Sequence, residues 1–174
     1  IFTRVPYQEN GKVLTVPFLI VINDDFLVTV CCEKMAFLGK FIDEKIDFST
    51  TQKTRLFLQF FTEINQAFNS LLTYISKDVR SISVQLEKIE NKDVLRFVGF
   101  EMVLNDFLTA LIPNSALLQK LLSGRFLKLY EKDRDLVEDL SLSTVQLIER
   151  CKADLKNIVN IRESYSTIIT NNLN

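Results

Sequence analysis

The chain has 174 residues, of which 47% are hydrophobic and 25% charged, and its formal net charge is -1. This composition allows a hydrophobic core with a soluble surface, and the near-neutral charge argues against nucleic acid as a partner. Histidine is absent, and no nucleophile–base pair, phosphate loop or cofactor motif occurs, so an enzyme is the least supported class.

The first 32 residues predict an antiparallel meander of strands. Strands are expected at residues 1–5, 13–22 and 26–32, with turns at 8–11 and 23–25. Runs this continuously apolar are typical of strands that are buried on both faces, so helices are expected to cover the sheet. Three strands alone make a marginal sheet, and more strands are expected before the first residue.

The three cysteines predict free thiols. Cys31 and Cys32 are adjacent and point to opposite sides of a strand, and Cys151 lies far from them in the sequence. No CxxC pair exists, so neither a zinc knuckle nor a redox motif is supported. We therefore expect unbridged cysteines in a reducing compartment.

Helical periodicity begins after the strands. A short helix is expected at residues 35–42, and Ser49 or Thr50 is a candidate N-cap for a long helix that runs to Ile89. Its apolar residues alternate steps of three and four, which is the seam of long packed helices. This seam consists of Ile64, Phe68, Leu71, Ile75, Val79, Ile82, Leu86 and Ile89.

A second long helix is expected at residues 94–122, after a tight turn at residues 90–92. Pro113 lies inside this helix and should kink it or open a turn. Gly124 is a plausible residue for the left-handed position after the helix. The last helix, at residues 131–174, contains neither Gly nor Pro and would span roughly 65 Å, which predicts a coiled-coil strand or the stalk of an oligomer.

Two stripes follow the second half of the last helix. One is apolar, and the other is polar and keeps one direction through heptad spacing: Glu163, Thr167, Thr170 and Asn174. A solvent face explains such a stripe, although solvent faces are usually rich in Lys and Glu. The alternative is a water-filled channel in a symmetric bundle, where hydroxyl and amide oxygens meet a hydrated cation.

An acidic cluster marks the start of the last helix. It consists of Glu131, Asp133, Asp135, Glu138 and Asp139. Carboxylates favour a helix N-terminus through the macrodipole, which explains the cluster without any ligand. Oxygen ligands also suit hard cations such as Mg²⁺ and Ca²⁺, so a cation site is the functional alternative, although no EF-hand spacing is present.

The order of these segments resembles the cytosolic region of CorA magnesium transporters. Four stretches carry the resemblance, at residues 27–33, 64–87, 111–118 and 162–174, and together they extend over nearly the whole chain. The resemblance implies a mostly helical α+β fold, part of an α/β/α layered cytosolic domain that continues into long antiparallel helices and a stalk helix. The corresponding segments are residues 1–48, 49–127 and 128–174.

The resemblance also implies a function and its residues. It implies the regulatory domain of a divalent-cation channel in the plasma membrane, on the cytoplasmic side, built as a homopentamer and joined to membrane helices that follow this sequence. Asp139 and Glu138 would belong to an inter-subunit Mg²⁺ site. The pore would be lined by Glu163, Thr167, Thr170, Asn171 and Asn174. Mg²⁺, Co²⁺, Ni²⁺ and Zn²⁺ remain open as the ion, because the Gly-Met-Asn selectivity motif lies outside this sequence. The alternative function is a soluble helical coiled-coil scaffold.

Overall fold

The computed structural model describes residues 1–9, 11–84, 89–124, 127 and 129–172, and it confirms a mostly helical α+β fold. Three strands are followed by one short helix and three long ones. In chain order the elements are β1 (Phe2–Glu9), β2 (Lys12–Ile22), β3 (Leu27–Cys31), α1 (Ala36–Ile42), α2 (Lys53–Ser83), α3 (Asn91–Leu122) and α4 (Glu131–Asn172).

The sheet is the expected antiparallel meander in the order β1-β2-β3. One face packs toward α2 and α3 and buries Phe18 and Ile20 completely. The prediction that both faces are buried is wrong for the described chain, because Val21, Val28 and Val30 on the opposite face are 40 to 54% exposed. Side chains alternate between the two faces of a strand, and in this structure helices cover only one of them.

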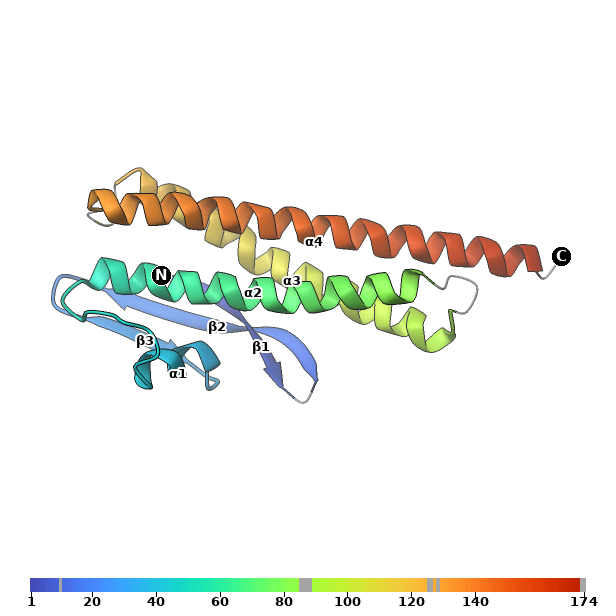
Figure 1. The fold of residues 1–174 in the computed structure, drawn as a ribbon, viewed down its shortest axis with the longest axis horizontal. Helices are drawn as coiled ribbons and strands as arrows, with labels where there is room; N and C mark the ends of the chain where they lie inside the picture. The colour runs from blue at the N-terminus through green and yellow to red at the C-terminus, as the bar shows by residue number, and fades with distance from the viewer. Residues whose placement is uncertain (10, 85–88, 125–126, 128, 173–174) are drawn as a thin grey trace.

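The long helices stack on the sheet in an antiparallel arrangement. In Figure 1, α2 lies between the sheet and α4, and α3 crosses behind them. Of all pairs of elements, α3 and α4 share the most extensive contact. The end of α2, the start of α3 and the C-terminal end of α4 therefore meet at one end of the molecule. There the last turns of α4 reach past the other two helices (Figure 1).

The predicted start of α2, with Ser49 or Thr50 as N-cap, is two or three residues early. The N-cap residue is Gln52, which makes no capping hydrogen bond through its side chain. Of the two predicted caps, Ser49 instead shares a hydrogen bond with the hydroxyl group of Thr51 at 2.8 Å, and neither Ser49 nor Thr50 is the N-cap. This is the local competition for hydrogen bonds that makes Ser and Thr ambiguous as helix-start signals.

The predicted turn at residues 90–92 is also misplaced, because α3 already begins at Asn91. Glu90 is the N-cap, and its side chain and that of Asp93 form a reciprocal capping box. The helix then continues through Pro113 to Leu122, so the proline opens no turn. Gly124 follows with φ at +71°, as expected for the left-handed position after a helix.

The core lies along the seam where α2, α3 and α4 meet and under the inner face of the sheet. The seam predicted for α2 is confirmed at Ile64, Phe68, Ile75, Val79 and Ile82, whereas Leu71 is only partly buried and Leu86 lies outside the described residues. Ile89 is buried as well, but the prediction that the helix runs to it is wrong, because α2 ends at Ser83. All three cysteines are free. Cys151 is completely buried in this seam, and burial raises the pKa of its thiol to about 12.

Candidate functional site

The polar stripe near the end of α4 is exposed. The side chains of Glu163, Thr167 and Thr170 face solvent in the described structure. Thr167 donates its hydroxyl hydrogen to the carbonyl oxygen of Glu163 at 3.0 Å, and Thr170 donates to that of Ser166 at 2.9 Å. Each threonine oxygen therefore presents lone pairs outward, which is the polarity that a hydrated cation requires.

The two predicted asparagines of this stripe are only partly covered by the structure. The backbone of Asn171 is in α4, but its side chain is not described. Asn174 lies outside the described residues. On the neighbouring face, Ile158 is fully buried while Ile161 and Tyr165 pack against the core, so the apolar stripe fixes the rotation of α4 and directs the polar stripe outward.

The acidic residues at the start of α4 do not share one surface. Asp133 is 6% exposed and borders a cavity of about 900 Å³ between the starts of α2 and α4. Glu138 and Asp139 are exposed, and Glu138 accepts a hydrogen bond from Arg134 at 3.3 Å. For Asp139, the described part of the chain provides no hydrogen bond or ion pair, so its carboxylate faces solvent without a partner.

Two absences hold for the described residues. Among them, no three Cys, Asp or Glu side chains come together in a way that could hold a metal ion. Within the same residues, no helix combines the length and the apolar character needed to cross a membrane.

Polar contacts join α2 to α4, and the sequence alone does not predict them. Asn65 donates from Nδ2 to Thr144 Oγ1 at 2.9 Å, and both side chains are buried. Two turns farther along, Arg150 donates to Asn69 at 2.5 Å and to Thr73 at 3.1 Å. These contacts join residues 77 to 81 positions apart, so no local pattern in the sequence points to them.

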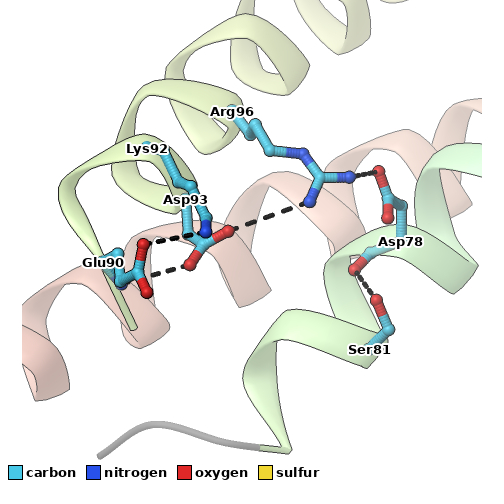
Figure 2. Close-up of polar contacts among 6 residues, drawn as sticks. All are labelled: Asp78, Ser81, Glu90, Lys92, Asp93 and Arg96. Carbon is cyan, nitrogen blue, oxygen red and sulfur yellow. Dashed lines mark hydrogen bonds and ion pairs between the residues drawn. The ribbon is translucent and has the colours of Figure 1, made fainter. Parts of the chain in front are cut away.

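An ion cluster secures the end of the α2–α3 hairpin (Figure 2). Arg96 on α3 forms an ion pair with Asp78 on α2, and its second nitrogen lies 3.8 Å from Asp93. Asp93 also accepts a hydrogen bond from the backbone N–H of Glu90 at 3.1 Å, which links the ion cluster to the start of α3. The Glu90-to-Asp93 spacing is the one local signal of this cluster in the sequence.

A second ion pair joins α3 to the exposed part of α4. Arg162 donates from Nη1 to both carboxylate oxygens of Glu101, at 2.7 and 2.9 Å. Arg162 directly precedes Glu163 of the polar stripe, and both side chains border a groove of about 550 Å³ between α3 and α4. The ion pair therefore lies beside the candidate ion path, and no local pattern in the sequence points to it, because its partners are 61 positions apart.

Comparison with protein families gives one match. The family described as CorA-like Mg²⁺ transporter protein matches residues 1–174, which is the whole chain. No curated protein matches the chain.

Several solved structures share the fold, and two of them are CorA structures. One is the complete structure of the CorA magnesium transporter from Methanocaldococcus jannaschii, which is 20% identical with a TM-score of 0.87 over 99% of this chain and 56% of that one. The other is the structure of the soluble domain of CorA from the same organism, which is 22% identical with a TM-score of 0.82 over 94% of this chain and 67% of that one. The chain thus spans little more than half of the complete transporter.

Proposed function

The chain belongs to the CorA-like Mg²⁺ transporter family, and we propose that it is the cytosolic regulatory domain of a divalent-cation transporter. In this proposal residues 1–48 form the sheet layer, 49–127 the helical hairpin and 128–174 the stalk that continues toward the membrane. The family match and the shared fold support this function over the helical scaffold that the sequence also allowed.

The polar face of α4 is the observation that carries this proposal. Copies of the exposed stripe of Glu163, Thr167 and Thr170, arranged around a common axis, would line a wide path with carboxylate and hydroxyl oxygens. The threonine hydroxyls already donate to the backbone of their own helix, so they would only accept hydrogen bonds from the waters around an ion. A ring of carboxylates raises the local concentration of cations, and hydroxyl oxygens let hydrated ions pass.

The assembly in this proposal is a homopentamer on the cytoplasmic side of the plasma membrane. Its α4 helices would surround the axis, and Asn171 and Asn174 would continue the path toward the membrane. Mg²⁺ is the cargo that we propose first, and Co²⁺, Ni²⁺ and Zn²⁺ are the alternatives to be compared with it. Hard oxygen ligands and retained water favour Mg²⁺ over the softer ions.

Cation uptake by the transporter that contains this chain, reconstituted into vesicles, tests the path. Glu163→Gln should lower Mg²⁺ flux at low ionic strength, because it removes a negative charge from each copy of the stripe. Asp106→Asn on α3 is the matched control, since this carboxylate is exposed and lies outside the stripe. Equal flux from both variants would contradict the assignment of α4 to the path.

We also assign a regulatory role to Asp139 and Glu138. Both carboxylates are exposed at the start of α4, where a neighbouring subunit would complete the ligand set. An ion that binds only when two subunits approach must stabilise that approach by the same free energy. Mg²⁺ on the cytosolic side would then hold the transporter closed, and its loss would let the repelling carboxylates separate.

The dependence of flux on cytosolic Mg²⁺ tests this regulation. Asp139→Asn should weaken the closing response while conduction itself survives. The control is again Asp106→Asn, which removes one exposed charge elsewhere in the same domain. If the closing response of Asp139→Asn equals that of the unaltered transporter, the acidic cluster only stabilises the N-terminus of α4 through the helix dipole.

A further inference from the structure

We propose that Glu101 is a positioning residue, which holds the positive charge of Arg162 on the α3 side and so keeps it out of the ion path at Glu163. The inference rests on the ion path proposed above and adds a residue from a different helix to it. Neither the periodicity of α4 nor the family match assigns any role to Glu101.

The contact itself is specific. A single nitrogen of Arg162 lies 2.7 and 2.9 Å from the two carboxylate oxygens of Glu101, across 61 residues of sequence. The Glu101 side chain is 22% exposed and that of Arg162 is 42% exposed, so the pair lies at the edge of the α3–α4 interface. Hydrogen bonds between two charged groups are stronger than neutral ones and hold a long side chain in one direction.

The surroundings of Arg162 show where its charge would go without Glu101. The positions three and four residues away on α4 carry Ile158, Val159, Tyr165 and Ser166, none of which is acidic. After Asp154, Glu163 is the one acidic residue in the rest of the sequence. Arg162 and Glu163 already border the same groove, so a released guanidinium group has this carboxylate within its neighbourhood.

The electrostatic consequence follows from these positions. If the guanidinium group of Arg162 approached Glu163, its positive charge would weaken the negative potential by which this carboxylate attracts a passing cation. With Glu101 present, the charge of Arg162 is paired on the α3 side, so it does not offset the negative potential of Glu163 toward solvent. The ion pair thus keeps two oppositely charged neighbours apart, so Arg162 does not compete with the transported cation for Glu163.

Two single variants that break the same ion pair separate this role from a structural one. Glu101→Gln frees the charge of Arg162, whereas Arg162→Gln removes that charge. In the reconstituted transporter at low ionic strength, we expect Glu101→Gln to lower Mg²⁺ flux about two- to fivefold, and Arg162→Gln to keep or raise it. The double variant Glu101→Gln/Arg162→Gln should return to the flux of Arg162→Gln alone.

Thermal unfolding supplies the readout for a structural role. Both single variants lose the same pair, so they should lower the Tm by similar amounts while their fluxes differ. Equal losses of flux in the two singles, or no change in either, would overturn the inference and leave the ion path intact. Unchanged flux in a Glu163→Gln variant would contradict the proposed ion path, and the proposed role of Glu101 would fall with it.

Discussion

The two halves of α4 share one heptad spacing but have different surroundings. In the first half, residues 131–151, the seam is buried and contains Val137, Leu140, Leu147 and Cys151. In the second half, residues 152–172, the seam is buried only as far as Ile158, and beyond it Ile161 and Tyr165 are only partly covered. The difference shows that periodicity determines which face of a helix is apolar, whereas the length of the neighbouring helices determines how deeply that face is buried.

The outer faces differ as well. The first half carries charged residues of both signs on its outer face, as solvent-exposed helices usually do. In the second half the outer face is uncharged after Glu163 and consists mainly of hydroxyl and amide residues. One helix thus combines a half that anchors it in the core with a half whose surface differs from an ordinary solvent face.

Truncation of one apolar residue in each half gives the largest expected difference. Leu147→Ala should lower the free energy of unfolding by about 2 to 5 kcal/mol, because a buried leucine leaves both lost contacts and a cavity. Ile169→Ala, at a position that is 40% exposed, should cost below about 1 kcal/mol. Urea unfolding of the two variants measures this, and equal losses would mean that both halves are anchored alike.

Removal of one hydroxyl from each half gives the next largest effect. Thr144→Val deprives the buried Asn65 amide of its closest acceptor and should cost about 1 to 3 kcal/mol in the free energy of unfolding. Thr170→Val, whose hydroxyl bonds only its own helix, should stay within about 0.5 kcal/mol. Recovery of stability in an Asn65→Leu/Thr144→Val double variant would identify the unpaired amide as the cause.

Alkaline pH probes the buried half alone. Burial raises the pKa of Cys151 from 9.0 to about 12, so the folded chain keeps a thiol proton that the unfolded chain loses above pH 9. The contribution of this thiol is present below pH 9 and is lost as pH rises toward 12. Relative to Cys151→Ala, the unaltered chain should lose about 1.4 kcal/mol between pH 7 and pH 10.

The matched control for this pH effect is Cys32→Ala, which removes an exposed cysteine and keeps Cys151. Equilibrium unfolding of the three chains at both pH values provides the measurement. Cys32→Ala should lose stability between pH 7 and pH 10 by the same amount as the unaltered chain. A Cys151→Ala chain with the same alkaline loss would show that the buried thiol is not its source.

The arginines of α4 give the smallest expected effect. Arg150 bonds neutral groups on α2, whereas Arg162 forms an ion pair with α3, and both side chains lie near the surface. Replacing either with Gln should cost below about 1 kcal/mol, but only the cost of Arg162→Gln should shrink at 1 M salt, where charges are screened within about 3 Å. The free energies of unfolding at low and at 1 M salt measure this, and an equal salt dependence of the two variants would contradict the prediction.

The sequence predicts elements better than it predicts contacts. Apolar runs bounded by turns and heptad steps are enough to predict the order and type of every element, because both depend on neighbours a few residues away. The start of α2 differs from the prediction of Ser49 or Thr50 as N-cap, and Ser49 bonds Thr51 instead, a competition that composition does not reveal. The start of α3 was missed because its capping box uses Glu90 and Asp93 in place of the more familiar Ser or Thr pattern.

For the candidate site, too, local patterns in the sequence predict which residues share a face but not which residues they contact. Heptad spacing was enough to place Glu163, Thr167 and Thr170 on one exposed face. Two contacts were not predictable: that of Arg162 with Glu101 and that of Thr144 with Asn65. The partners lie 61 and 79 positions away, and periodicity predicts which face of a helix is polar or apolar but not which residues contact that face. The orientation of Asp133 toward the core was likewise hidden, since an acidic helix start normally faces water.

The length of α4 has a mechanical consequence. From Thr144, where the helix is held against Asn65, to its last described residue lie 28 residues, or roughly 42 Å of helix. A straight rod of that length works as a lever arm: a tilt of about 5° at Thr144 displaces the far end by roughly 4 Å. Rearrangements at the core contact too small to unpack a side chain would thus become, at the other end, movements wider than a water molecule.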